Sequence, residues 1–133
     1  MKGLVHIYEG TGKGKTTAGV GLTIRCAGNG FPVVYSQFLK DGTTGEMNIL
    51  RKIPNITVLV EEHHFGFSFL MTPEEKVEAK AAYTALFEKV KAAAVEQNAR
   101  LLVMDEMLDL CNAELIDTAS VVDFLKNRPE QLE

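Results

Sequence analysis

Cysteine and positive charge are both scarce in this chain, and each shortage excludes a class of protein. The 133 residues include two cysteines, Cys26 and Cys111, which lie far apart and fit no zinc or redox spacing. Buried free thiols in a reducing cytoplasm are therefore expected. The formal net charge of -4 argues against general nucleic-acid binding, because that function needs a basic face.

Long apolar runs are also missing. None approaches the ~20 residues that a membrane-spanning helix requires, so we expect no membrane partner. Residues 4–8 form a short apolar stretch that we expect to be the first strand, which leaves no room for a signal peptide. Length and ordinary composition predict one cytoplasmic domain over residues 1–133, large enough for a core of its own.

The glycine-rich segment at residues 9–17 is the most informative feature of the sequence. It reads Glu-Gly-Thr-Gly-Lys-Gly-Lys-Thr-Thr, between the expected strand at 4–8 and the expected start of a helix at 18–24. Glycines let backbone N–H groups point at an anion, and a helix N-terminus adds partial positive charge. A lysine and a threonine hydroxyl in this context are typical of a nucleoside triphosphate site that also holds magnesium.

The spacing of this loop departs from the usual phosphate-binding pattern, Gly-x-x-x-x-Gly-Lys-Ser/Thr. Here the first glycine is one residue closer to the second, and an extra glycine and lysine lie between them. A glycine-rich turn without a ligand is the alternative, but it explains neither the lysine nor the pair of threonines. The residues of the loop expected to bind a nucleoside triphosphate are Gly10, Thr11, Gly12, Lys13, Gly14, Lys15, Thr16 and Thr17.

Predicted strands and helices alternate along the chain. Strands are expected at 4–8, 33–38, 56–60 and 101–104, and helices at 16–27, 46–52, 73–97 and from 118 to just before 129. This alternation predicts an α/β fold of three layers, similar to P-loop NTPases, with a mainly parallel sheet flanked by helices. Ligands of such sheets bind beyond the carboxyl ends of the strands, so the loops there should meet the phosphate loop.

Two acids, Asp105 and Glu106, end the apolar stretch at residues 101–104. Alone they are a weak signal, because strands often end in charge. Behind a phosphate loop they resemble the acidic strand end that completes a magnesium site. Successive side chains point to opposite faces of a strand, so we expect only one of the two to face the metal directly. A glutamate can also activate water in hydrolases, so the pair does not by itself identify the reaction.

Six segments in this order, spread over nearly the whole chain, resemble the corrinoid adenosyltransferases of the CobA/BtuR type. They are residues 10–17, 25–28, 37–40 with 45–46, 66–69, 104–107 and 125–129. The resemblance implies transfer of the 5′-deoxyadenosyl group of ATP to the cobalt(I) of a corrinoid, with release of triphosphate. It further implies Mg²⁺, an external electron donor such as a reduced flavoprotein, and a homodimer.

The resemblance also implies roles for individual residues. Lys13, Lys15 and the backbone of the loop would hold the triphosphate. Thr16 and Glu106 would ligate magnesium, with Asp105 in the ligand set or directly behind it. The catalytic residues would then include Lys15 and Glu106.

A third catalytic role falls on an aromatic side chain in the apolar loop at residues 63–71. In the family, such a side chain displaces the lower axial ligand of cobalt and so makes cobalt(II) easier to reduce. Phe69 lies where many relatives carry tryptophan, and Phe67 is the alternative. A loop packed on the core is the other interpretation. Arg25, in the first helix, would either contact the nucleotide or be a solvated helix charge.

Two other functions fit parts of the pattern. A conventional P-loop ATPase or small-molecule kinase would use Lys15, Thr16 and the acidic pair for γ-phosphoryl transfer. A non-catalytic carrier of ATP and corrinoid would fit the phenylalanine at position 69 and the expected lack of the segment that relatives carry after Pro129. Relatives continue there with a strand, a Thr-Gly-Arg segment and a helix, and we expect this domain to lack that strand and helix.

Overall fold

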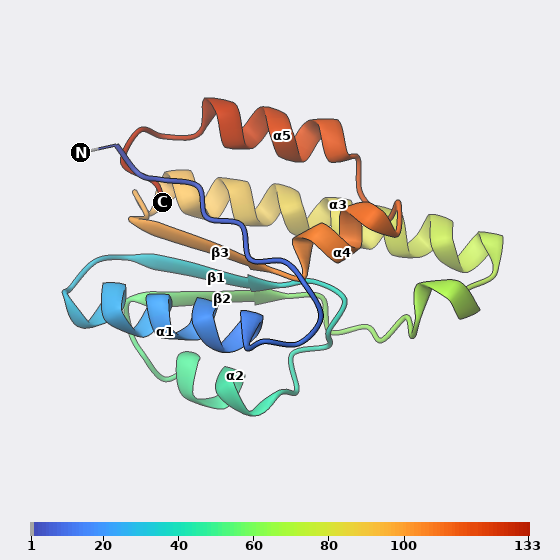
Figure 1. Cartoon of the computed structure of the whole chain (residues 1–133), viewed down its shortest axis with the longest axis horizontal. Coiled ribbons are helices and arrows are strands. Elements are labelled where there is room, and N and C mark those ends of the chain that lie inside the picture. Colours follow the sequence, from blue (N-terminus) through green and yellow to red (C-terminus); the bar gives the residue numbers. More distant parts are fainter. Residues whose placement is uncertain (1) are drawn as a thin grey trace.

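A three-stranded parallel sheet separates two layers of helices (Figure 1) in the computed structural model, which describes residues 2–133. The spatial order of the strands is β2-β1-β3. Both neighbouring pairs are parallel and in register from end to end. The strands are β1 (Val33–Gln37), β2 (Ile56–Val60) and β3 (Leu101–Asp105).

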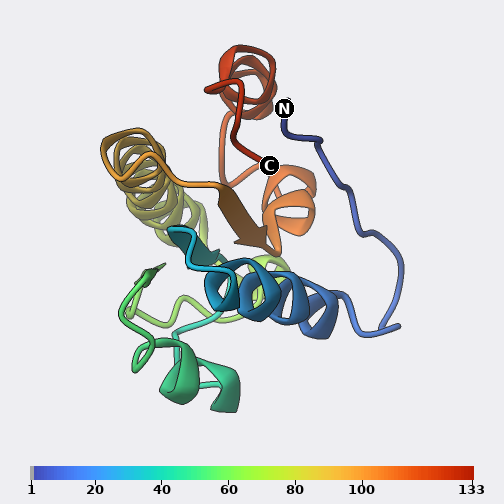
Figure 2. The same ribbon diagram turned by 90° about the vertical axis from the view of Figure 1, so that its left-hand side faces the viewer.

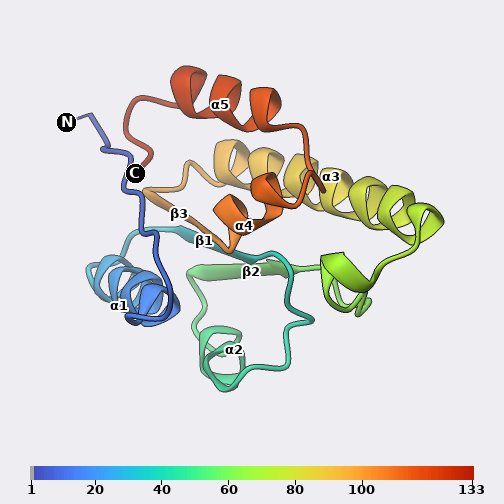
Figure 3. The same ribbon diagram turned by 45° about the vertical axis from the view of Figure 1, so that its right-hand side comes forward.

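Helices cover both faces of the sheet (Figures 1 and 3). One face carries α1 (Lys15–Gly28) and α2 (Gly45–Leu50). The other face carries α3 (Pro73–Glu96), α4 (Met107–Asn112) and α5 (Thr118–Asn127). A short 3₁₀ turn, η1 (Ser68–Leu70), lies in the loop that leads from β2 to α3. The result is the three-layer α/β arrangement predicted from the sequence.

The side chains of β1 alternate between two hydrophobic clusters, one on each face of the sheet. Val34 packs with Tyr83 in the cluster under α3, α4 and α5. Val33 and Tyr35 pack with Met47 in the cluster under α1 and α2. All of β1 is buried, as expected for the central strand of a parallel sheet covered on both faces.

Most of the expected elements are confirmed, with ends that differ by one or two residues. This holds for the strands at 33–38, 56–60 and 101–104 and for the helices at 16–27, 46–52, 73–97 and after Asp117. Two elements, η1 and α4, were not predicted. Both are too short to produce a helical period in the sequence.

The expected strand at residues 4–8 is wrong, and so is the expected burial of the cysteines. The segment is an extended coil that runs beyond the outer edge of β3 (Figure 2). Leu4 is 63% exposed and Ile7 is 66% exposed, and a cavity lies between this segment and β3. An apolar run becomes a strand only when a neighbour supplies hydrogen bonds to its backbone, and β3 does not do so here. Cys26 and Cys111 are free and half-buried.

No helix within residues 2–133 combines the length and the apolar character that crossing a membrane would require.

The start of α3 offers a test of the local sequence signals. The Thr72 hydroxyl accepts a hydrogen bond from the Glu75 N–H at 3.2 Å, and Pro73 occupies the first turn. We expect Thr72→Ala to lower the free energy of unfolding by ~1 kcal/mol, because the first turn loses its cap. Urea denaturation measures this change.

The matched control is Thr84→Ala, an exposed position inside α3. This control should leave stability unchanged or raise it slightly, because alanine has the higher helix propensity. Equal losses in the two variants would contradict the capping role of Thr72.

Candidate functional site

The loop before α1 depends on left-handed backbone geometry. The φ angles are 117° at Gly10, 66° at Gly12, 64° at Lys13 and 72° at Gly14. Glycine adopts such angles without strain, which explains three of these four positions, while Lys13 adopts one as a non-glycine residue. No side chain caps α1, so the loop leads directly to the free N–H groups of its first turn. These N–H groups and the helix dipole favour an anion at this position.

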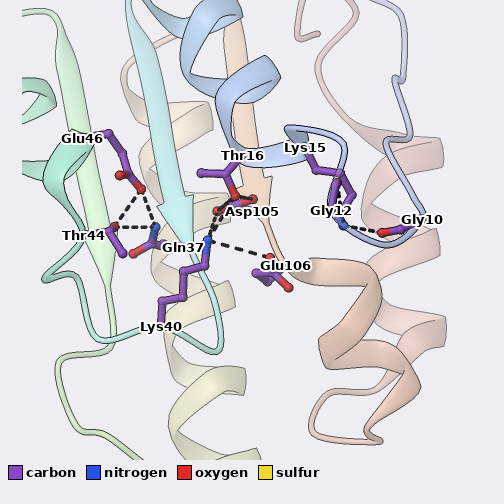
Figure 4. Close-up of polar contacts among 10 residues, drawn as sticks. All are labelled: Gly10, Gly12, Lys15, Thr16, Gln37, Lys40, Thr44, Glu46, Asp105 and Glu106. Atoms are coloured by element: carbon purple, nitrogen blue, oxygen red, sulfur yellow. Dashed lines mark hydrogen bonds and ion pairs between the residues drawn. The ribbon is translucent and has the colours of Figure 1, made fainter.

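Lys15 folds back onto the loop (Figure 4). Its ammonium group donates a hydrogen bond to the Gly10 carbonyl and a second one, at 3.3 Å, to the Gly12 carbonyl. Lys13 is exposed on the same loop. The loop therefore carries two ammonium groups. That of Lys15, which is half-buried, donates to backbone carbonyl oxygens, and the oxygens of an anionic ligand could take their place.

Thr16, Lys40 and Asp105 meet at the carboxyl edge of the sheet (Figure 4). The Thr16 hydroxyl donates to both oxygens of the Asp105 carboxylate, at 3.1 and 3.0 Å. The Lys40 ammonium lies 3.1 Å from Asp105 Oδ2 and 3.0 Å from Thr16 Oγ1. Asp105 is only 9% exposed, so its charge needs these partners.

Glu106 follows Asp105 but lies apart from Thr16. It adopts a left-handed φ of 67° at the start of α4, and one of its carboxylate oxygens lies 3.8 Å from the Lys40 ammonium. Burial and a hydrogen bond with Asp109 raise the pKa of Glu106 above its ordinary value, against the opposing effect of Lys40. The acid in contact with Thr16 is thus Asp105, while Glu106 lies near the same Lys40 ammonium at the longer distance.

Lys40 is the site residue that the sequence analysis left without a role. It follows the carboxyl end of β1, where ligands of parallel sheets bind, and that position was the available signal. The preceding residue, Leu39, has a φ of 60°, so the chain turns sharply after β1. A lysine in a loop is most often a solvated surface charge. The sequence around Lys40 does not distinguish it from such a lysine.

A second polar cluster lies beside this site, between β1 and α2. The Gln37 amide donates to the Thr44 hydroxyl and to Glu46 Oε1, both at 3.3 Å, and Thr44 donates to Glu46 at 2.7 Å. Burial raises the pKa of Glu46, but hydrogen bonds from Thr44, its own backbone and Gln37 outweigh it and leave the pKa below its ordinary value. The site therefore lies between two carboxylates that are both held in hydrogen bonds.

The oxygen atoms around Lys40 fit a magnesium ion. Mg²⁺ in nucleotide sites takes one or two protein oxygens and completes its shell with phosphate oxygens and water. Thr16 and Asp105 supply such oxygens, and a cation, the Lys40 ammonium, already contacts both. Within residues 2–133 there is no cluster of three or more His, Cys, Asp or Glu side chains that could hold a metal ion. A magnesium ion at Thr16 and Asp105 would therefore need phosphate oxygens or water as further ligands.

Arg25 is not brought to this site. It lies in the last turn of α1, ten residues after Lys15, which corresponds to ~15 Å along a helix. Its side chain is exposed. Of the two alternatives for Arg25, the geometry favours a solvated helix charge.

Phe67 and Phe69 belong to the segment between β2 and α3, and this segment lies beyond the same carboxyl edge (Figure 1). Their rings stack on one another with centroids 5.4 Å apart, and they are 68% and 78% exposed. Phe65 holds the base of the loop by packing on Tyr83, at 5.7 Å between ring centroids. The two outer rings are therefore not part of the core, and they form an apolar surface that is open to a ligand.

Fold and site together define a protein of the P-loop-like α/β class, with a glycine-rich loop in front of α1. The comparison with protein families narrows this class. The family described as ATP:corrinoid adenosyltransferase BtuR/CobO/CobP matches residues 1–133, and the chain belongs to it.

Individual relatives carry the same family name. A corrinoid adenosyltransferase of a Sinorhizobium species is 30% identical over 94% of this chain and 58% of its own length. The corrinoid adenosyltransferase of Escherichia coli K12 is 28% identical over 98% of this chain and 64% of its own length. The corrinoid adenosyltransferase CobA of Salmonella typhimurium LT2 is 28% identical over 96% and 63%. This chain thus spans about three fifths of each relative's length.

The contacts of Lys40 lead to a prediction about metal binding. Its ammonium group neutralises Asp105 at the position that a divalent cation would take. We expect Lys40→Met to tighten the binding of Mn²⁺ in the absence of nucleotide by about tenfold or more, because competition by the ammonium charge is lost. Electron paramagnetic resonance of free Mn²⁺ measures the change.

Lys52→Met, at an exposed lysine just after α2, is the matched control and should leave Mn²⁺ affinity unchanged. Equal affinities for the wild type and Lys40→Met would contradict the position assigned to the Lys40 charge.

Proposed function

We propose that this protein transfers the 5′-deoxyadenosyl group of ATP to the cobalt(I) of a corrinoid and releases inorganic triphosphate. One observation carries the proposal: a shortened phosphate loop with two lysines, in a chain that belongs to the adenosyltransferase family over its whole matched length. Synthesis and salvage of adenosylcobalamin are both compatible with this activity.

In the proposed reaction, cobalt(I) of the corrinoid substrate attacks C5′ of ATP. The C5′–O bond breaks, and its electron pair leaves with the triphosphate. Lys13, Lys15 and the N–H groups of the loop are suited to bind this leaving group, because they concentrate positive charge where negative charge grows. Lys15 must then exchange its bonds to the Gly10 and Gly12 carbonyls for phosphate oxygens.

Thr16 and Asp105 would hold the magnesium ion of MgATP, and Glu106 is within reach of the same position. When bound, magnesium supplies further neutralisation of the triphosphate charge. Lys40 would leave Asp105 and turn toward the phosphate groups. An exchange of one cation for another keeps the nearly buried Asp105 carboxylate paired throughout.

The stacked pair Phe67 and Phe69 supports the corrinoid part of the proposal. Exposure of two large aromatic rings to water is unfavourable. A corrin macrocycle offers them a broad apolar face. A ring pressed against the lower face of the corrin would keep water and an axial ligand from cobalt. We assign this role first to Phe69, which is the more exposed of the two.

We further infer that the electron for cobalt comes from an external donor such as a reduced flavoprotein, and that the protein works as a cytoplasmic homodimer. These inferences follow from the family resemblance described above. We infer that residues 1–133 form a single adenosyltransferase domain.

The direct test mixes the protein with ATP, Mg²⁺ and chemically reduced cob(I)alamin. Corrin absorbance and nucleotide products are then followed together. The proposal predicts a light-sensitive adenosyl-corrinoid and one triphosphate per turnover. Formation of ADP would instead identify a conventional ATPase or kinase, and binding of both ligands without turnover would identify a carrier.

Substitution of the loop lysine tests the role of the phosphate loop. We expect Lys15→Met to lower kcat/KM for ATP by about 100-fold or more, because the leaving triphosphate loses a charged donor. Lys80→Met, at an exposed position of α3, is the matched control and should retain wild-type activity. A fall in kcat/KM of less than about threefold for Lys15→Met would show that this lysine does not stabilise the transition state.

Substitution of the aromatic ring tests the corrinoid role separately. With cob(II)alamin and a reducing system, Phe69→Ala should slow adenosylation by about tenfold or more, since the axial ligand is no longer displaced. With cob(I)alamin prepared beforehand, the adenosylation rate of Phe69→Ala should stay within about twofold of wild type, because the reduction step is bypassed.

The matched control is Leu70→Ala, on the same 3₁₀ turn and 70% exposed. Equal losses with both cobalt states would show that Phe69 contributes only to binding. The same comparison for Phe67→Ala decides which ring acts.

A further inference from the structure

Gln37 carries a buried oxygen atom that no part of the site described above uses. The Gln37 side chain is fully buried, and its amide nitrogen donates to Thr44 and Glu46. Its amide oxygen, Oε1, has no hydrogen-bond partner within residues 2–133. Buried polar atoms without a partner are rare, because leaving one unpaired destabilises the fold. The exception at Gln37 calls for a donor that pairs with this oxygen in some state of the protein.

Glu46 fixes the orientation of the Gln37 amide. A carboxylate only accepts hydrogen bonds, so the amide nitrogen must point toward Glu46 Oε1, 3.3 Å away. The amide oxygen then occupies the other corner of the amide group, where it can itself only accept. The Thr44 hydroxyl is not its donor, because that hydroxyl donates to Glu46 at 2.7 Å. The missing partner of Gln37 is thus a donor from outside this cluster.

Gln37 lies beside Asp105 in the sheet. The two residues pair in register at the ends of β1 and β3, and neighbouring strands are about 4.8 Å apart. Residues paired in this way point their side chains to the same face, which here is the face covered by α1 and α2. Figure 4 shows both side chains at the carboxyl edge of the sheet. A neutral acceptor therefore lies next to the charged acceptor that Lys40 contacts.

Lys40 is the donor that can serve both acceptors. It follows Gln37 by three residues, and the turn at Leu39 brings its ammonium group to 3.1 Å from Asp105 Oδ2. Lysine has a flexible four-carbon side chain, so its ammonium group can move by about one strand spacing while the backbone stays in place. A change of side-chain rotamer is therefore enough to carry the ammonium group from Asp105 toward Gln37.

The charge of Lys40 already acts on the cluster around Gln37. The pKa of Glu46 is below its ordinary value: burial opposes this shift, while hydrogen bonds from Thr44, its own backbone and Gln37, together with the Lys40 charge, produce it. The Gln37 nitrogen is bonded to this carboxylate. Such a bond polarises the amide and strengthens any hydrogen bond that its oxygen accepts. The Gln37 oxygen is thus well suited to a cationic donor.

We propose that Gln37 is a positioning residue for Lys40: its amide oxygen accepts a hydrogen bond from the Lys40 ammonium group when a divalent cation displaces that group from Asp105. The inference rests on the magnesium position of the proposed function, at Thr16 and Asp105. Metal binding then transfers the ammonium group from one acceptor to another instead of releasing it to water. The ammonium group stays at the carboxyl edge, where the phosphate groups of ATP can compete for it.

The first experiment measures the affinity for Mn²⁺ by electron paramagnetic resonance of the free ion. Four forms of the whole chain are compared: the wild type, Gln37→Met, Lys40→Met and the double variant. Methionine is an unbranched side chain close to glutamine in size, but it has no amide oxygen. Neither ATP nor corrinoid is present, so the result does not depend on transfer activity.

With Lys40 present, Gln37→Met should weaken Mn²⁺ binding by about fivefold or more, because the displaced ammonium group has lost its acceptor. In the Lys40→Met background the same substitution should change the affinity by less than about twofold, since no ammonium group needs an acceptor there. Gln37→Asn, which keeps an amide but shortens the side chain, should repeat this pattern and serves if the methionine variant does not fold.

The matched control is Gln97→Met, at an exposed glutamine that follows α3. This control should leave Mn²⁺ affinity unchanged in both backgrounds.

The second measurement needs no substitution at Gln37. The ¹³Cδ resonance of the Gln37 side chain is followed by NMR while Mg²⁺ is added without nucleotide. A charge-assisted hydrogen bond polarises the amide carbonyl, so this resonance should shift downfield in the wild type. It should move less in Lys40→Met, because the donor is missing.

Three results would overturn the proposal. Equal effects of Gln37→Met with and without Lys40 would show that the amide oxygen pairs with a fixed partner, such as the Tyr35 hydroxyl, which is also buried and unpartnered within residues 2–133. Tighter Mn²⁺ binding by Lys40→Met, with no effect of Gln37→Met in either background, would overturn this inference alone. Absence of Mn²⁺ binding in both the wild type and Lys40→Met would overturn the magnesium position and this inference with it.

Discussion

The parallel register of the three strands is the constraint on which the candidate site depends. Gln37, the last residue of β1, pairs with Val60 at the end of β2 and with Asp105 at the end of β3. All three strands therefore end at the same level, and their following loops open at one edge. The start of α1 lies at this edge too, which allows Thr16 to reach Asp105 across 89 positions of sequence. The side chains of the candidate site come together only because the three strands end at the same level.

The charged side chains at that edge are paired with one another in the absence of a ligand, so their burial does not destabilise the fold. Asp105 is nearly buried and is paired with Lys40 and Thr16, while Lys15 is satisfied by carbonyls of its own loop. In the proposed function, components of MgATP replace two of these sets of partners: the cation replaces Lys40 at Asp105, and phosphate oxygens replace the carbonyls at Lys15. If the proposal is right, substrate binding is an exchange of equivalent partners rather than the burial of new charge.

The sequence predicted those elements whose partners are either local or buried on both sides. The apolar runs of β1, β2 and β3 and the Thr72 cap of α3 belong to this group. Residues 4–8 have the same apolar composition but no backbone partner, so composition alone led to a wrong strand. Lys40 was missed because its role comes from its place at the strand edge. The assignments of Thr16, Asp105 and Glu106 as magnesium ligands remain predictions, with Asp105 now the nearer acid to Thr16.

The most direct measurement follows the oxygen atom that joins C5′ to the α-phosphorus of ATP. ATP carrying ¹⁸O at this bridge is turned over with Mg²⁺ and cob(I)alamin, and the products are analysed by mass spectrometry. Adenosyl transfer breaks the C5′–O bond, so the label must appear in triphosphate and be absent from every adenosine-containing product. Label retained in ADP would show that a P–O bond was broken, and the assignment of this chain as an adenosyltransferase would be wrong.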